Sequence, residues 1–279
     1  MNSNLKKIDY CSDTHWDFIF NPSSNINIRK IEPYFNRYFN DQKSDTLIIA
    51  GDTGHYIHQD NTILCYIKER YKNVIVTLGN HNVYCVGGQK LEYKHWSEKY
   101  KKQLDIFRSS DIIVLDGDIV EIDGVSIGGA MGWYDGQFFF QNGFYTGYGE
   151  TIQSLWKSSS NDSRLIPGLA SFYEIWEIEK EKINKVLDKC DVMVTHFQPS
   201  INSEVFSEVF RQDRTNGFYS FDYDEQLQNL KRTKVWVYGH THIRKETDIY
   251  GIKLVANPFG YKEENGKDAY IRTFEIERN

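Results

Sequence analysis

Short apolar runs rich in β-branched and aromatic residues recur along the chain, each bounded by glycine or polar residues. Runs of this length and composition predict β-strands. Five of them are followed within two residues by Asp, Asn or His: Lys7–Cys11, Thr46–Ala50, Val74–Leu78, Val192–Thr195 and Val235–Tyr238. Helices are predicted in the first hundred residues at Ile26–Phe39, Asn61–Tyr71 and Gln89–Leu104. The alternation of strand and helix predicts an α/β fold.

The pattern changes in the middle of the chain, where three short strands follow one another: Ile112–Leu115, Ile119–Ile122 and Val125–Gly129. Asp123-Gly124 between the last two favours a tight hairpin turn. This region predicts a second sheet or an antiparallel extension of the first. A helix is expected at Ala170–Leu187, and Ala269–Glu277 alternates like a final strand.

The polar residues that follow the five strands carry metal-binding or phosphate-binding chemistry. They read Asp13-Thr14-His15, Gly51-Asp52, Gly79-Asn80-His81, His196 and Gly239-His240-Thr241-His242. Each group alone is common in turns and helix caps. Together they are unusual, because five of the eight histidines of the chain fall at these positions. Ligands bind at the carboxyl ends of strands in such sheets, and carboxylates with imidazoles and no thiolates suit divalent ions.

In this order the motifs resemble the calcineurin-like metallophosphoesterase superfamily, which carries D-x-H, G-D, G-N-H, an isolated H and G-H-x-H. The matching residues span positions 13–242, nearly the whole chain. Pro199 after His196 also matches, and Asn257–Tyr261 with Glu263 resembles the tail of many small bacterial members. The resemblance implies an α/β four-layer αββα sandwich, with two mixed sheets flanked by helices.

The resemblance also implies two divalent metal ions, of Mn, Fe, Zn, Co or Ni. One ion would be bound by Asp13, His15, Asp52 and His242. The other would be bound by Asp52, Asn80, His196 and His240, with Asp52 bridging the two. Ions about 3.5–4 Å apart lower the pKa of a water held between them, and this water attacks phosphorus in line.

The resemblance assigns a catalytic role to His81. Because neighbours on the chain point apart, His81 is not expected to ligate if Asn80 does, and it would face the substrate as an imidazolium. Two positions depart from the family pattern. Asn82 stands where members often carry an acid, and His55 stands where some phosphatases carry an Asp that orients the catalytic histidine. The partner of His81 therefore stays open, and His55 either binds a substrate phosphate or takes no part.

Composition sets further bounds. With 279 residues and 40% hydrophobic content, we expect one domain over residues 1–279. A net charge of -6 argues against binding long nucleic acid, although bound ions would still attract a nucleotide. Four dispersed cysteines without a C-x-x-C pair fit a cytoplasmic protein. The chain shows neither a signal-like start nor a run of roughly 18 apolar residues, so no membrane partner is expected. The oligomeric state stays open.

Residues 132–168 are rich in glycine and aromatic residues and form a candidate cap or lid. The aromatic rings would stack on a nucleobase or line an apolar pocket, or else pack against the protein's own sheet or a second subunit. Trp133-Tyr134-Asp135, directly after a strand, is the portion expected nearest the substrate. Residues 200–223 form a second candidate mobile segment, in which Arg211 or Arg214 would either hold a distal phosphate or, as is more common, be solvated.

The leading interpretation is a metal-dependent phosphoesterase acting on phosphomonoesters or small phosphodiesters, such as nucleotides or cyclic nucleotides. A metallo-nuclease of the same superfamily is one alternative, and it predicts a basic groove that the acidic composition disfavours. A catalytically silent scaffold is the other alternative. Scaffolds typically lose ligands, whereas all seven candidate ligands and His81 are present here.

Overall fold

The first sheet contains the strands that precede Asp13, Asp52 and Asn80. Its order is β11-β1-β2-β3-β4, with bounds Arg272–Glu277, Leu5–Cys11, Thr46–Ala50, Asn73–Thr77 and Ile113–Val114. Strands β1 to β4 are parallel, and β11 pairs antiparallel with β1. Strand β2 is buried along its whole length, which explains its unbroken apolar sequence. The computed structural model describes residues 4–20, 26, 28–142, 151–208, 213–261, 263–264 and 269–278.

The second sheet contains the strands that precede His196 and His240. Its order is β5-β6-β7-β8-β10-β9, with bounds Asp118–Ile122, Val125–Gly129, Val192–Val194, Val235–Tyr238, Ile252–Ala256 and Lys245–Ile249. An antiparallel hairpin closes each edge, and the central strands are parallel. Asp123 and Gly124 connect β5 to β6 with φ of 51° and 82°, as a two-residue type I′ turn requires.

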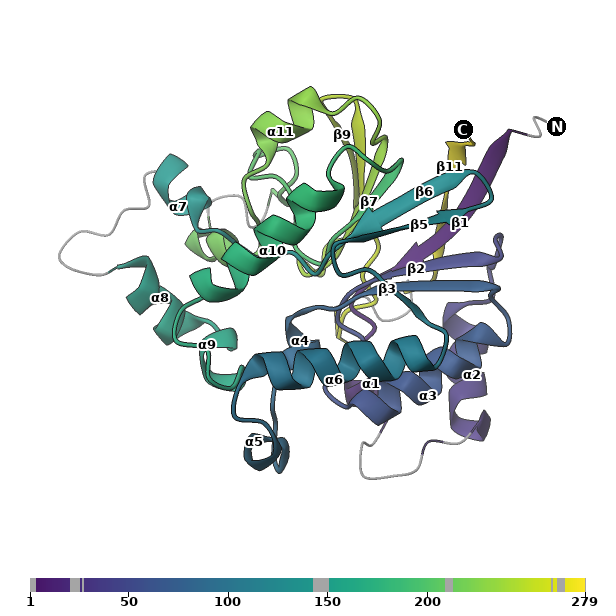
Figure 1. Cartoon of the computed structure of the whole chain (residues 1–279), viewed down its shortest axis with the longest axis horizontal. Coiled ribbons are helices and arrows are strands. Elements are labelled where there is room, and N and C mark those ends of the chain that lie inside the picture. Colours follow the sequence, from purple (N-terminus) through teal and green to yellow (C-terminus); the bar gives the residue numbers. More distant parts are fainter. Residues whose placement is uncertain are drawn as a thin grey trace.

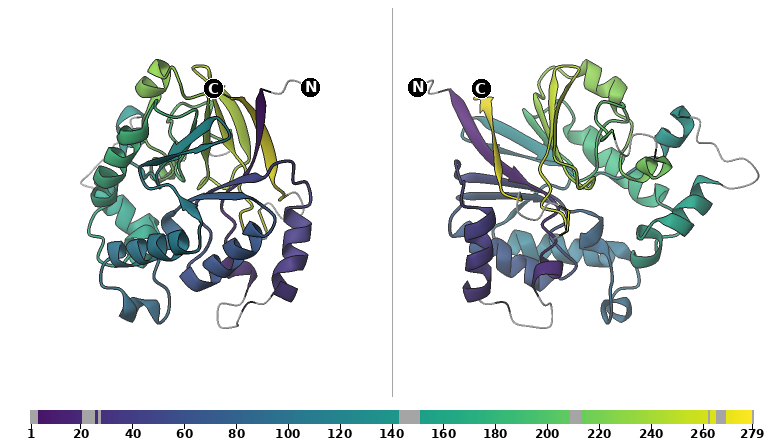
Figure 2. Two further views of the ribbon diagram at one scale, coloured as in Figure 1. Left: turned by 45° about the vertical axis from the view of Figure 1, so that its right-hand side comes forward. Right: turned by 180° about the vertical axis from the view of Figure 1, so that it is seen from behind.

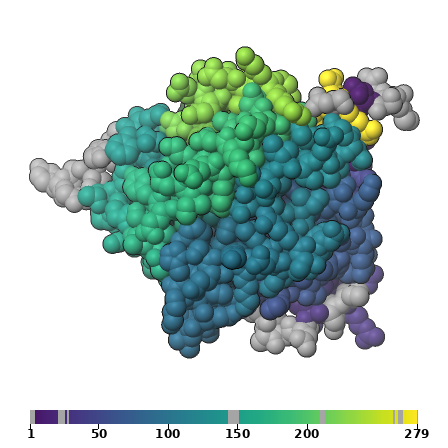
Figure 3. Space-filling model, in the orientation of Figure 1, coloured from purple at the N-terminus to yellow at the C-terminus, as the bar shows by residue number. Residues whose placement is uncertain are grey.

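The two sheets pack face to face through one apolar layer (Figure 1). This layer is built mainly from β-branched side chains, among them Ile8, Ile48, Ile75, Ile127, Val194 and Val237. The outer faces are covered by helices, as the two further views show (Figure 2). Helices α3 and α6 pack against β3 and β4, and α10 packs against β5 and β6. In the space-filling view, the blue to teal segments that cover the first sheet and the green segments that cover the second adjoin in one continuous surface (Figure 3).

Helices of the first half of the chain are α1 (Trp16–Ile19), α2 (Ile28–Tyr38), α3 (Ile57–Lys68), α4 (Asn80–Val83), α5 (Gln89–Glu92) and α6 (Trp96–Ser109). Later helices are α7 (Gln137–Gln141), α8 (Ile152–Ser159), α9 (Asp162–Leu165), α10 (Tyr173–Val186), the 3-10 helix η1 (Arg214–Phe218) and α11 (Asp224–Asn229). In the described part of the chain, none of them has the length and apolar character needed to cross a membrane.

The predicted α/β sandwich of two mixed, helix-flanked sheets is confirmed. The single helix predicted over Gln89–Leu104 is wrong, because α5 ends at Glu92 and α6 begins at Trp96. His95 caps the second helix by accepting a hydrogen bond from the Ser97 backbone N–H. In return, the Glu98 carboxylate accepts a hydrogen bond from the Lys94 backbone N–H, just before the helix. This reciprocal cap favours a new helix start over a continuous helix.

Candidate metal centre

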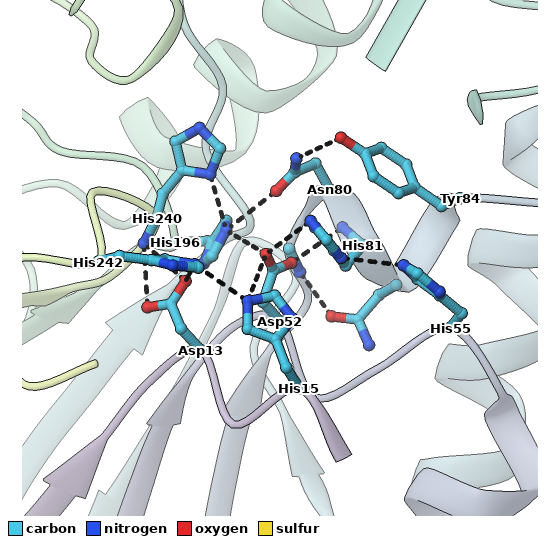
Figure 4. A network of polar contacts seen from close by, with 12 residues as sticks. Asp13, His15, Asp52, His55, Asn80, His81, Tyr84, His196, His240 and His242 are labelled. Atoms are coloured by element: carbon cyan, nitrogen blue, oxygen red, sulfur yellow. Dashed lines mark hydrogen bonds and ion pairs between the residues drawn. The ribbon is translucent and has the colours of Figure 1, made fainter. Parts of the chain in front are cut away.

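The candidate ligands meet where the parallel strands of both sheets end (Figure 4). Asp13 and His15 follow β1, Asp52 follows β2, and Asn80 begins α4 after β3. From the second sheet, His196 follows β7, and His240 and His242 follow β8. The centre therefore lies between the sheets, with oxygen ligands supplied mainly by the first and imidazoles mainly by the second.

The backbone itself turns the ligands inward. Five of the seven candidate ligands have left-handed φ values between 41° and 65°: Asp13, His15, Asp52, His240 and His242. Non-glycine residues seldom adopt this conformation, and they concentrate at functional sites. Close packing also matters, since a Cβ on Gly79 would lie 2.2 Å from Oδ1 of Asp52. Only glycine can therefore precede Asn80 in this arrangement.

One group of ligand atoms comes from Asp13, His15 and His242, which lie close enough to share a cation. Nε2 of His15 and Nε2 of His242 are 3.0 Å apart, and Nε2 of His242 is 3.4 Å from Oδ1 of Asp13. Two imidazole nitrogens and a carboxylate oxygen thus converge on one point, which fits a divalent ion.

A second group comes from Asp52, His196 and His240. Nε2 of His196 lies 3.2 Å from Oδ2 of Asp52 and 3.2 Å from Nδ1 of His240. It also lies 3.1 Å from Oδ1 of Asn80. Oδ2 of Asp52 is 3.9 Å from Nε2 of His15 in the first group, so this carboxylate stands between the two. A third group joins His81 to His15 and Asp52.

The outward nitrogens of three histidines are anchored to hydrogen-bond acceptors. Nδ1 of His196 is 2.9 Å from the Ala50 carbonyl oxygen, and Nε2 of His240 is 3.2 Å from the Phe218 carbonyl oxygen. Nδ1 of His242 is 2.6 Å from Oε2 of Glu264. A proton on each outward nitrogen leaves the lone pair of the other nitrogen directed at the centre. This donor set fits divalent ions, and the acid that contacts His242 is Glu264.

Asn80 is oriented by a carboxylate that the sequence did not indicate. Its Nδ2 donates to Oδ1 of Asp162 at 2.9 Å and to the Tyr84 hydroxyl at 2.9 Å, so its Oδ1 faces His196. Asp162 is almost fully buried and also accepts hydrogen bonds from the Tyr84 and Tyr134 hydroxyls. The α9 segment therefore reaches the candidate metal centre through one side chain.

Charges in the centre are set by burial and by the neighbouring rings. Burial alone would raise the pKa of Asp52, but His196, His81 and His15 together hold it well below its usual range. Burial lowers the pKa of His81 well below its usual range, against the opposing charge of Asp52. This shift favours a neutral ring over the expected imidazolium, and nearby cations would favour the neutral ring further.

His55 is not among the described residues that line the cavity at the centre. Its Nδ1 is 2.8 Å from Oδ2 of Asp17, and its Nε2 is 2.9 Å from Nδ1 of His81. Both ring nitrogens are therefore occupied by protein groups. The structure gives no support to a contact between His55 and a substrate phosphate.

Trp133 and Tyr134 are fully buried, so the expectation that they lie nearest the substrate is wrong. Their rings pack on Phe197, and Tyr134 also contacts Phe172. Phe138, Phe139 and Trp156 are buried as well, in agreement with packing against the protein itself. Phe144, Tyr145, Tyr148 and Arg211 lie outside the described residues.

A cavity of about 620 Å³ opens beside the ligands. Asp52, Asn80, His81, His240 and His242 form its floor. Its walls come from the α8–α9 segment, the chain between β7 and β8, and the residues around Tyr261. Lys245 is the one lysine or arginine among the described lining residues.

The fold and these motifs define an α/β sandwich with a candidate metal centre at the ends of its parallel strands. Comparison of the sequence with family profiles gives the family. The chain belongs to the calcineurin-like phosphoesterase family, whose sequence profile matches residues 6–244. No protein with a curated functional description matches the sequence significantly.

Solved structures of similar fold include the phosphopantetheinyl hydrolase PptH from Mycobacterium tuberculosis, which is 16% identical with a TM-score of 0.70. That match covers 98% of this chain and 97% of the other. The calcineurin-like phosphoesterase YfkN from Bacillus subtilis is 10% identical, with 99% and 91% coverage and a TM-score of 0.43. A 5'-nucleotidase precursor from Thermus thermophilus is 12% identical, with 98% and 54% coverage and a TM-score of 0.43.

Proposed function

We propose that this protein hydrolyses phosphate esters with two divalent ions, one held by Asp13, His15, Asp52 and His242, and the other by Asp52, Asn80, His196 and His240. The observation that carries the proposal is the convergence of their ligand atoms in two adjoining groups, with Asp52 between them. When bound, the ions would lower the pKa of a water between them and neutralise charge on the phosphoryl oxygens. Nε2 of His81 lies 4.0 Å from Oδ2 of Asp52 and faces the same space.

The cavity walls support a leaving group that is mostly uncharged. Beyond the ligands, Val205, Phe206 and Phe218 supply apolar surface. Ser160, Asn161, Gln198, Thr215 and Asn216 supply neutral polar groups. Because Lys245 is the one lysine or arginine in the described lining, a chain of further phosphates would meet little compensating charge. The position of Ser159 to Asp162 in the wall also supports a cap role for the later part of residues 132–168.

The first test is turnover of p-nitrophenyl phosphate and bis-p-nitrophenyl phosphate side by side, with manganese-reconstituted protein. The Asn80→Ala variant removes a proposed ligand, and Asn40→Ala is the matched control, because Asn40 is exposed and is not among the residues that line the cavity. We expect activity in the wild type and the control and a loss of about 10²-fold or more in Asn80→Ala. The preference between the two substrates would separate monoesterase from diesterase.

Two outcomes of the same experiment would contradict the proposal. Equal activity in the wild type and Asn80→Ala would remove the second ion from the reaction. A wild type that binds no ions and turns over neither ester would contradict the proposal altogether. If two ions bind without turnover of these substrates, a panel of cyclic nucleotides, nucleoside monophosphates and a phosphopantetheinyl ester follows, because the similarly folded Mycobacterium protein is named for the last substrate.

A further inference from the structure

A chain of three side chains leads from a buried carboxylate to the cavity. Oδ2 of Asp17 is 2.8 Å from Nδ1 of His55. Nε2 of His55 is 2.9 Å from Nδ1 of His81, and the two rings lie within 13° of parallel. The contact between His55 and His81 is visible in Figure 4. Since the three residues belong to α1, the loop before α3, and α4, only the tertiary fold brings them together.

Each member of the chain is held in place. The Asp17 side chain is 4% exposed and the His55 side chain 9% exposed. The His55 carbonyl oxygen accepts hydrogen bonds from Nζ of Lys99 at 2.8 Å and from Nε2 of Gln89 at 2.9 Å. A Cβ at Gly54 would lie 2.9 Å from Oδ1 of Asp17, so a side chain there would push the carboxylate aside.

The contacts determine which nitrogens carry protons. A carboxylate only accepts hydrogen bonds, so Nδ1 of His55 carries the proton shared with Asp17. Nε2 of His55 then presents a lone pair and accepts the hydrogen bond from Nδ1 of His81. With Nδ1 of His81 committed in this way, its Nε2 is turned towards the cavity, 3.3 Å from the Tyr261 hydroxyl.

We infer that Asp17 and His55 are positioning residues that fix the tautomer and orientation of His81, so that its Nε2 faces the substrate at a constant place beside the ions. Asp17 acts only through His55, and His55 acts only through His81. The kinetic part of this inference rests on the proposed function, whereas the tautomers do not depend on any activity.

The first test is therefore spectroscopic. Zinc-loaded protein with ¹⁵N-labelled histidine would be examined by long-range ¹H–¹⁵N correlation, with His55→Gln and His81→Ala used to assign the two rings. We expect the Nδ1–H tautomer at both rings in the wild type. In Asp17→Asn the amide can present either its oxygen or its NH2 group, so a mixture of tautomers is expected at His55. A wild-type His55 protonated at Nε2 instead would overturn the inference.

The second test is kinetic and uses Asp41→Asn as the matched control, because Asp41 is an exposed carboxylate paired with Lys43 on the surface. Asp17→Asn should keep two ions per chain, leave KM nearly unchanged and lower kcat about tenfold, as loss of an outer-shell partner does. Asp41→Asn should behave as the wild type. Loss of an ion from Asp17→Asn would show that Asp17 supports the His15 segment instead, and would overturn the inference.

A double-variant cycle tests whether Asp17 acts on His81 only through His55. If Asp17 acts only through His55, the double variant Asp17→Asn with His55→Gln should be no slower than His55→Gln alone. Effects that multiply would show that Asp17 acts by another route. If the wild type hydrolyses no phosphate ester at all, the proposed function fails. The tautomer measurement still tests the inference, because a proton on Nδ1 of His55 supports it and a proton on Nε2 overturns it.

Discussion

Replacing Asp162 with Asn should weaken one metal position and leave the other intact. Asp162 is not itself a candidate metal ligand. It accepts a hydrogen bond from the amide of Asn80, whose oxygen faces His196. Asn has nearly the same shape as Asp, so the substitution changes the acceptor without opening a cavity. The affected position is the one assigned to Asp52, Asn80, His196 and His240.

The size of the effect follows from the hydrogen bonds. The two Asp162 oxygens accept from Asn80, Tyr84 and Tyr134, whereas an Asn offers one oxygen. Hydrogen bonds to a carboxylate contribute about 1.5–3 kcal/mol each. A loss of about 2 kcal/mol in holding the Asn80 amide corresponds to roughly 30-fold weaker binding of the ion.

Metal content would be measured by elemental mass spectrometry during a titration with a competing chelator. We expect Asp162→Asn to release one ion at a lower chelator concentration than the wild type and to keep the other. Asp213→Asn is the matched control, because this carboxylate also lines the cavity but caps η1 instead of a candidate ligand. Unchanged release of both ions, accompanied by a lower melting temperature, would show that Asp162 serves stability alone.

Three further outcomes are expected. Asp52→Ala should lose both ions, and two ions per chain in that variant would exclude a bridging role. His81→Ala should keep both ions but lower turnover about 10²-fold; full activity in that variant would exclude His81 from the reaction. Burial raises the pKa of Asp135 from 3.8 to about 6. The stabilisation that comes from keeping this carboxyl protonated in the folded state is therefore full below pH ~4, and it is lost as the pH rises through about 6. Urea unfolding from pH 4 to 7 should therefore show Asp135→Asn gaining up to about 3 kcal/mol relative to the wild type, and parallel pH curves would contradict this.

Most of the fold could be predicted because the central strands are short, apolar and followed by the motif residues. The hairpin strand β9 was not predicted, since Lys245–Ile249 is charged and only its last residue is buried. Edge strands of this kind lack the apolar pattern by which buried strands are identified. Helices of four or five residues, such as α7 and α9, were missed because a single turn carries no periodicity.

The candidate ligands could be proposed from their positions after strands, but their supporting residues could not. Asp17, Asp162 and Glu264 lie on segments without a motif, and each reaches the centre only through the tertiary fold. The direction of the pKa shift of His81 could not be predicted for a similar reason. Burial and the surrounding rings set its pKa, and neither can be read from neighbouring residues in the sequence.

The left-handed backbone at five candidate ligands has a consequence for protein engineering. Such conformations cost of order 1–3 kcal/mol each in non-glycine residues, whereas glycine adopts them without strain. A glycine at His240, for example, would relieve backbone strain and remove an imidazole together. A search for variants that only resist heat would thus favour substitutions at the candidate metal ligands, and it would select proteins that have lost the proposed function. If the proposed two-ion centre is correct, selection for thermostability in this chain should also require that two ions are still bound.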